Sequence, residues 1–191
     1  MGERPRLFVD MDGTLALFQE IDTIETLFEE GYFKNLPPQV AVVNAVNTFL
    51  EQSDPEVDVY ILSSYLTDSD YALKEKNEWL DRYLPKIKPD HRIFLPCGDK
   101  KTDFIPKGIR ESDVLFDDYT LNLNDWEPPA IGIKCLNGIN HTRGTWQGRR
   151  VSIASTSSQL YDKLRDVCLN HTQIKDEKPD YNDTEYVKPR R

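Results

Sequence analysis

Two acidic residues, Asp10 and Asp12, stand two positions apart and directly follow the apolar run at 7–9. Carboxylates at this spacing repel each other. A turn with no other task more commonly uses a single Asp or Asn with a glycine. The sequence continues with Gly13 and Thr14, so a turn suited to glycine follows the acids. Either a cation lies between the two acids or the acids themselves do chemistry.

A second acidic pair, Asp117 and Asp118, follows another strand-like run at 113–116. None of the four carboxylates has an obvious basic partner nearby in the sequence. Hard oxygen ligands that converge in this way favour a hard divalent cation, and Mg²⁺ is the one we expect. Either pair alone could equally be a capped turn or a solvated acidic loop, but two pairs at two strand ends favour a metal site.

Two further polar sites lie between the acid pairs. Ser63 and Ser64 follow the apolar run at 57–62, where a hydroxyl and main-chain N–H groups beside a helix start could bind an anion. A serine-rich turn is the alternative. Lys100 and Lys101 lie between the third and fourth predicted strands, where a lysine could neutralise a carboxylate and a phosphate together. The spacing fits either lysine, and a solvated surface lysine is the alternative.

Strand-like and helix-like segments alternate along the chain, which is typical of an α/β protein with a parallel sheet and crossover helices. We expect strands at 7–10, 57–62, 92–95, 113–116, 131–136 and 151–153. We expect helices at 15–30, 39–52 and 67–84, and a last helix from 155 with a capping box at 156–159. In an open parallel sheet, ligands bind beyond the carboxyl ends of the strands. The polar sites therefore fall on one edge of the predicted sheet.

The chain has 191 residues, 38% of them hydrophobic, which suits one globular domain with a buried core. We expect this domain at 1–170 and a flexible polar tail at 171–191. No segment approaches the roughly 18–20 apolar residues of a membrane span. The first predicted strand begins too early to leave room for a signal peptide. We therefore expect a cytoplasmic protein without a membrane partner.

Charge and cysteine content restrict the partners further. The net charge of −9 disfavours binding to a long nucleic acid, because that requires clustered Lys and Arg. A single small phosphorylated ligand remains compatible, since a local site can be positive inside an acidic protein. The three cysteines, Cys97, Cys135 and Cys168, are widely spaced and indicate neither a disulfide framework nor a zinc site.

In chain order, “DMDGT”, “SS”, “K” and “DD” resemble the four motifs of the haloacid dehalogenase superfamily of phosphohydrolases, over about residues 6–140. The resemblance implies a three-layer Rossmann-like fold, with helices on both faces of a mainly parallel sheet and a very small helical cap after the first strand. It also implies a bound Mg²⁺ ion and a covalent aspartyl-phosphate mechanism. The cap would occupy residues 15–36.

The same resemblance assigns the catalytic roles. Asp10 would be the nucleophile that attacks phosphorus, with Mg²⁺ and Lys101 offsetting the charge repulsion. Asp12 would protonate the leaving oxygen and then activate water. Lys101 is preferred to Lys100 because it begins “KTDFI”, and relatives place the lysine before a short segment that ends in an aliphatic residue. Thr14 would support the turn after the acids by hydrogen bonding.

The resemblance also implies the phosphate and metal ligands. Ser63 would hold a phosphoryl oxygen with help from the N–H group of Ser64. Asp117 would bind the metal together with Asp10 and with Asp12, the latter through its main-chain carbonyl. Asp118 would be a second acidic ligand or a partner of the ligands.

Wider sequence context, including “GYFKNLPP”, “VYILSSY” and “VLFDDYTLNLNDWE”, resembles the cytosolic 5'(3')-deoxyribonucleotidase group and its small bacterial and phage relatives. The substrate implied is a nucleoside monophosphate. The cap is short beside the helical bundle of the mammalian-type enzymes, so the site is open. An open site could relax specificity, admit a larger phosphorylated substrate, or need a second subunit in a homodimer to cover it.

Aromatic residues near the predicted site could stack on a base. The candidates are Phe18, Tyr32, Phe33 and Tyr65, with Trp126 and Trp146 further along. The loop at 137–150, with its histidine and arginines, could also fold over the site or form a long hairpin. Two alternative functions stay open: a phosphatase of a phosphosugar or similar small ester, and a non-catalytic nucleotide-binding regulator. Intact acids at positions 10 and 12 speak against the regulator.

Overall fold

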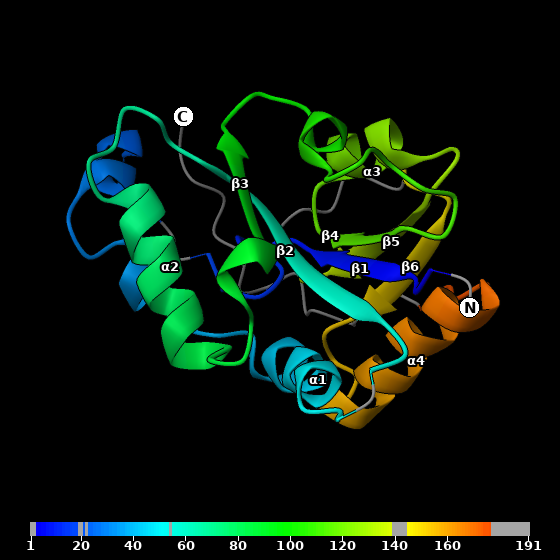
Figure 1. The fold of residues 1–191 in the computed structure, drawn as a ribbon. Coiled ribbons are helices and arrows are strands. Elements are labelled where there is room, and N and C mark those ends of the chain that lie inside the picture. The colour runs from blue at the N-terminus through cyan, green and yellow to red at the C-terminus, as the bar shows by residue number, and fades with distance from the viewer. Residues whose placement is uncertain (1–2, 19–20, 22, 54, 139–144, 177–191) are drawn as a thin grey trace.

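The computed structural model describes residues 3–18, 21, 23–53, 55–138 and 145–176. Its centre is a six-stranded sheet in the order β3-β2-β1-β4-β5-β6, and every neighbouring pair is parallel (Figure 1). The strands are β1 (Arg6–Val9), β2 (Asp58–Tyr65), β3 (Arg92–Pro96), β4 (Val114–Asp117), β5 (Ile131–Leu136) and β6 (Arg149–Ser152). The α/β, Rossmann-like fold predicted from the sequence is confirmed.

Helices cover both faces of the sheet (Figure 1). The α-helices in the described residues are α1 (Val40–Leu50), α2 (Ala72–Tyr83), α3 (Thr120–Trp126) and α4 (Ser157–Asn170). The 3-10 helices are η1 (Ile24–Phe28), η2 (Phe33–Asn35), η3 (Pro89–His91) and η4 (Lys101–Phe104). Side chains alternate across β1: Leu7 and Val9 join the core with α1, α2 and α4, whereas Phe8 joins the core with α3.

The sheet order reverses beside β1. From β1 the chain adds β2 and β3 on one side, then crosses to β4 and adds β5 and β6 on the other. Such a reversal opens a crevice at the carboxyl ends of the two strands that flank it. Asp10 directly follows β1 and Asp117 ends β4, so the switch point lies between the two predicted acidic motifs.

All six predicted strands are present, but the second is longer than expected. Ser63 and Ser64 lie within β2, paired with Phe94 and Leu95 of β3, and α2 begins only at Ala72. The prediction that the two serines sit beside a helix start is therefore wrong. The Ser63 hydroxyl and the Ser64 carbonyl instead accept hydrogen bonds from a lysine of the site described below.

The α-helix predicted at 15–30 is also wrong. At the start of this cap segment the backbone bonds to residues 37–39: the Leu17 N–H donates to the Pro37 carbonyl at 2.8 Å, and the Gln39 N–H to the Leu15 carbonyl at 2.7 Å. Only η1 and η2 are helical in the described part of the cap. Tertiary pairing therefore overrides an apolar spacing that resembles a helix.

The described structure continues past α4 into the first six residues of the predicted tail, 171–176. The capping box of α4, between Thr156 and Gln159, is confirmed. Beyond this helix, residues 171–176 run beside β6, where the Arg150 N–H donates to the Ile174 carbonyl and the Asp176 N–H to the Arg150 carbonyl. The remainder of the predicted tail, 177–191, lies outside the described residues, and so do residues 139–144 of the loop at 137–150.

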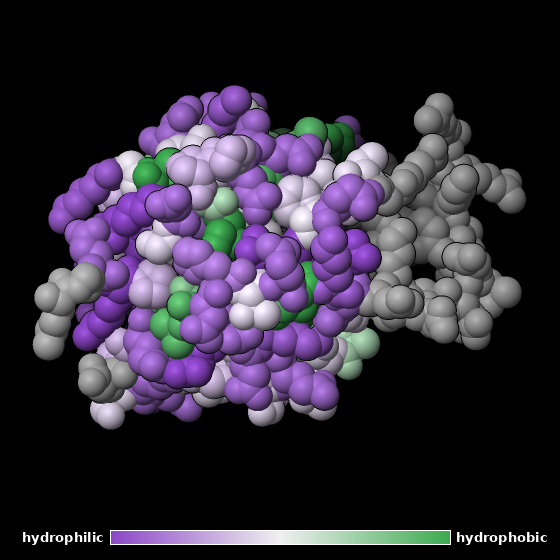
Figure 2. Space-filling model, turned by 90° about the vertical axis from the view of Figure 1, so that its right-hand side faces the viewer, coloured by the Kyte–Doolittle hydropathy of each residue, from purple (hydrophilic) through white to green (hydrophobic). Residues whose placement is uncertain are grey.

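The face drawn in Figure 2 is mainly hydrophilic, with small hydrophobic patches separated by polar side chains. Within the described ranges, no helix has the length and apolar character needed to cross a membrane.

Candidate active site

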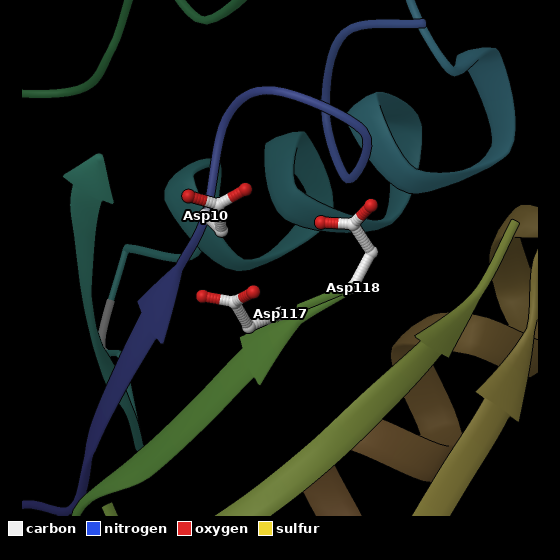
Figure 3. A group of neighbouring side chains, drawn as sticks. All are labelled: Asp10, Asp117 and Asp118. Carbon is white, nitrogen blue, oxygen red and sulfur yellow. The ribbon is translucent and has the colours of Figure 1, made fainter. Parts of the chain in front are cut away.

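Three acids meet at the switch point of the sheet. Asp10 extends from the end of β1, Asp117 from the end of β4, and Asp118 from the next residue (Figure 3). One carboxylate oxygen of each lies within 4.8 Å of those of the other two, and all three residues are buried. Buried carboxylate oxygens at this spacing suit a hard cation such as Mg²⁺. These three acids, called the acid cluster below, are the residues that could hold it.

Lys101 is the counter-ion of the acid cluster. Its Nζ donates to Asp10 Oδ1 and to Asp117 Oδ2, both at 2.6 Å, and the residue is only 3% exposed. Burial alone would lower the pKa of Lys101, but the two carboxylates raise it above its usual range. Lys101 therefore stays charged. Lys100 faces solvent instead, 3.6 Å from Asp125, so the structure brings only the preferred lysine to the acids.

Burial strongly raises the pKa of Asp10, and the nearby Asp117 and Asp118 raise it further, whereas Lys101 lowers it. Lys101 alone thus does not offset the cost of placing three carboxylates together. A bound cation would favour the ionised form of Asp10 that a nucleophile requires.

The loop after β4 is held by several donors. Asp117 accepts from the Tyr119 N–H at 2.7 Å and from Asn122 Nδ2 at 2.9 Å. Asn137 Nδ2 donates to Asp118 Oδ2 at 2.8 Å and to the Gly13 carbonyl at 2.6 Å, which joins the two acidic motifs directly. The cluster is consequently pre-organised by residues from β4, α3 and the end of β5.

Lys134 on β5 donates hydrogen bonds to the same loop. Its Nζ donates to the Asp118 carbonyl and, at 2.9 Å, to Thr120 Oγ1. Burial lowers the pKa of Lys134, although the nearby carboxylates of Asp118 and Asp117 oppose this. The sequence reasoning did not identify either this lysine or Asn137.

Asp12 has a separate partner, Lys76 of α2, which is fully buried. Lys76 Nζ donates to Asp12 Oδ2, to Ser63 Oγ at 3.1 Å and to the Ser64 carbonyl at 2.7 Å. The carboxylate of Asp12 therefore pairs with Lys76, while the acid cluster consists of the other three acids. Lys76 was missed because lysines are normally solvated. The signal was its spacing: it stands four residues from both Ala72 and Leu80, on the buried face of α2.

The turn after the first strand is built by the main chain. Gly13 has φ +85°, and a Cβ atom at this position would collide with the Asp118 carboxylate, so both backbone conformation and space require glycine. The Gly13 N–H donates to the Ala16 carbonyl at 2.8 Å. Thr14 is buried, and its hydroxyl has no hydrogen-bond partner among the described residues. The hydrogen bond that Thr14 makes in this turn comes from its main chain, whose N–H donates to the Met11 carbonyl at 3.3 Å.

Two adjoining hollows border these residues. The first, called the polar cavity, has a volume of about 330 Å³, and its lining residues are Asp10, Asp12, Phe18, Ser63, Ser64, Asp117, Asp118, Tyr119 and Asn122. The second, called the apolar pocket, has a volume of about 170 Å³. Its apolar lining residues are Phe18, Leu27, Phe33, Tyr65 and Leu66. Asp12, Ser64 and Phe18 line both hollows, so a ligand in one can extend into the other.

Three of the six aromatic candidates, Phe18, Phe33 and Tyr65, thus line the apolar pocket. Tyr32 is not among the lining residues of either hollow and packs edge-on against Phe33, with ring centroids 5.0 Å apart. Trp126 and Trp146 are wrong as ligand contacts, because both are buried in the core on the α3 face.

In the described part of the loop at 137–150, Asn137 contacts the site, whereas the two arginines at its end contact the segment after α4. Arg149 donates to the Thr172 and His171 carbonyls, and Arg150 to the Asp176 carbonyl. These two arginines hold the C-terminal segment in place, whereas His141 and Arg143 lie outside the described residues.

Comparison with known protein families matches residues 19–151 to the family described as “5' nucleotidase, deoxy (Pyrimidine), cytosolic type C protein”. The match covers more than half of the 191 residues. The chain belongs to this family. Membership in this nucleotidase family confirms the branch predicted from the sequence. The motif at 10–14 precedes the matched range and is therefore a separate observation in its favour.

Two staphylococcal proteins, each named “Putative 5'(3')-deoxyribonucleotidase”, are among the similar proteins. The Staphylococcus epidermidis protein is 28% identical over 120 residues, which covers 63% of this chain and 59% of the relative. The Staphylococcus aureus protein is 29% identical over 119 residues, which covers 62% of this chain and 58% of the relative. The match thus spans less than two thirds of the length of either relative.

Proposed function

We propose that this nucleotidase-family chain is a Mg²⁺-dependent phosphomonoesterase that removes phosphate from nucleoside monophosphates, deoxy forms included, through a phosphorylated Asp10. The observation that carries the proposal is the placement of two lysine–acid groups beside one polar cavity. Lys101 joins Asp10 to Asp117, and Lys76 joins Asp12 to Ser63. A phosphate in this cavity would meet a nucleophile and an acid, each of which is held by a buried lysine.

Asp10 is the nucleophile in this proposal. Its carboxylate attacks phosphorus, the bond from phosphorus to the leaving oxygen breaks, and Asp12 gives that oxygen a proton. Asp12 then takes a proton from water, which attacks the phosphorylated Asp10, releases phosphate and restores both acids. Lys76 holds Asp12 in place, and Ser63 and Ser64 offer polar groups to the phosphoryl oxygens.

Mg²⁺ held by the acid cluster, with the main-chain carbonyl of Asp12 as a further ligand, would offset the negative charge of the phosphate and the carboxylates. Lys101 supplies the permanent part of that compensation. Gly13 and Asn137 keep the two acidic motifs at a fixed separation, since Asn137 bonds to both.

The substrate class follows from family membership and from the apolar pocket beside the cavity. With phosphate against Asp10, the leaving group extends past Asp12 toward the aromatic side chains of Phe18, Phe33 and Tyr65. Such a pocket favours a flat base over the hydroxylated ring of a phosphosugar. A cytoplasmic location and a homodimer that covers the site stay predictions.

Phosphate release from a panel of deoxyribonucleoside and ribonucleoside monophosphates and phosphosugars, each with Mg²⁺, tests this proposal. We expect the highest kcat/KM for nucleoside monophosphates and no release after Mg²⁺ is removed with EDTA. Equal or better activity on phosphosugars would overturn the substrate assignment. Activity that persists in EDTA would overturn the role of the metal, and nucleotide binding without turnover would favour the regulator.

A further inference from the structure

Glu75 of α2 is a buried carboxylate outside the catalytic groups, only 2% exposed. Its oxygens accept main-chain N–H groups from one short segment: Gly31 on Oε1, and Phe33 and Lys34 on Oε2 at 3.0 and 3.4 Å. The Nζ of Lys34 lies 3.8 Å from Oε1. A buried charge is costly unless it is hydrogen-bonded. Here three amides of residues 31–36, called the cap loop, provide those bonds.

A second contact ties the end of the cap loop to the same face of α2. Trp79, one helical turn after Glu75, donates its indole N–H to the Leu36 carbonyl at 2.8 Å. Glu75 and Trp79 thus hold both ends of the cap loop against α2. At the start of the cap, by contrast, the main chain of residues 15–17 bonds to residues 37–39.

The held loop carries one wall of the apolar pocket. Phe33 is 4% exposed and lines the pocket, and its ring centroid lies 5.0 Å from Lys76 Nζ. Lys76 directly follows Glu75 in the chain and contacts Asp12. Two neighbouring residues of α2 therefore position two different parts of the site. Glu75 holds the loop that carries Phe33, and Lys76 holds the carboxylate of Asp12.

We propose that Glu75 is a positioning residue for the leaving group. It fixes the cap loop so that Phe33 closes the apolar pocket, and in this way it sets the affinity for the base of the substrate without affecting the phosphoryl chemistry. This inference rests on the proposed function. It adds that substrate preference depends on a buried carboxylate that touches neither phosphate nor base.

The test compares Glu75→Gln with wild type. Gln keeps the size of the side chain, but its NH₂ group cannot accept a hydrogen bond from a main-chain N–H. At least one of the hydrogen bonds to the cap loop is therefore lost. For a deoxynucleoside monophosphate, we expect KM to rise about tenfold, the effect of losing one well-placed aromatic contact. For acetyl phosphate, which has no ring, kcat and KM should stay at the wild-type values. Inhibition by inorganic phosphate should also be unchanged.

Glu78→Gln is the matched control, because Glu78 lies on the same helix, has a side chain that is 42% accessible and pairs with Lys74 at 3.6 Å. Its kcat and KM for the nucleotide and for acetyl phosphate should equal those of wild type. If Glu75→Gln does not fold, Trp79→Phe removes the second contact and keeps an aromatic ring. A smaller increase of KM for the nucleotide alone is then expected. Equal losses on both substrates, or no loss on either, would overturn the proposal.

Amide hydrogen exchange separates this inference from the proposed function. Residues 31–36 should exchange faster in Glu75→Gln than in wild type or in Glu78→Gln. If wild type releases phosphate from no substrate, the proposed function fails, and the exchange rates still decide whether Glu75 holds the cap loop. Unchanged exchange in Glu75→Gln would overturn the positioning role even in an active enzyme.

Discussion

Replacing Lys101 by Met removes the ammonium group that the acid cluster shares. Both ion pairs of Lys101 are buried and have N–O distances of 2.6 Å, so the variant leaves Asp10 and Asp117 without this partner. Removing one member of a buried ion pair costs about 3–5 kcal/mol. At roughly 2–4 °C per kcal/mol for a chain of this size, the Tm of the metal-free protein should fall by about 6–20 °C.

Mg²⁺ should recover part of that loss. The variant site is more negative by one charge, so the added cation should raise the Tm of Lys101→Met by more than it raises that of wild type. Phosphatase activity should stay absent, because the cation compensates charge without replacing the ammonium group that orients Asp10.

Lys100→Met is the control for the neighbouring residue. Its pair with Asp125 is exposed, with side chains 62% and 45% accessible, so the loss should be at most about 1 kcal/mol. Thermal melting in EDTA and in Mg²⁺, together with phosphate release, measures all three proteins. If the two variants melted alike, or if Lys101→Met kept its activity, the assignment of Lys101 as counter-ion of the cluster would be refuted.

Three further predictions concern the acids and their turn. Asp10→Asn should keep the wild-type circular dichroism spectrum and release no phosphate; turnover at the wild-type rate would rule out a covalent role for Asp10. Because the pKa of Asp10 is raised, its contribution to metal-free stability is present at low pH and is lost as pH rises through the folded-state pKa. Mg²⁺ displaces that proton, so its stabilisation in thermal melts should be larger at about pH 7.5 than at about pH 5, and a pH-independent gain would contradict this. Gly13→Ala should lower stability by about 1–3 kcal/mol and reduce activity, since φ is +85° and Asp118 occupies the space; wild-type values for both would show that the turn tolerates a side chain.

The centre of the sheet was predictable because β1, β4 and β5 are buried on both faces. Each strand therefore appears as a short apolar run, and the acids at 10 and 117 directly follow or end such runs. The parallel order then brings strand ends together, which is why acids more than 100 residues apart in the sequence could be assigned to one edge. Helix α3 was missed because its seven residues include only a few apolar side chains.

The cap and the supporting polar groups could not be predicted, because their partners are distant in the sequence. Residues 15–17 have helix-like apolar spacing, yet their main chain pairs with 37–39. Asn137 contacts Gly13 across 124 positions, and only the finished sheet places them together. Lys76 could have been suspected from its position on an apolar helix face, but its choice of Asp12 as partner depends on tertiary structure.

The central claim is that Asp10 carries the phosphoryl group during turnover. The most direct measurement is to mix the Mg²⁺-loaded protein with a deoxynucleoside monophosphate, quench with acid within one turnover, and analyse the peptides by mass spectrometry. We predict that the peptide containing Asp10 gains the mass of one phosphoryl group, and that the gain is absent in Asp10→Asn and in EDTA. Rapid phosphate release with no phosphorylated Asp10 peptide at any quench time would contradict the account.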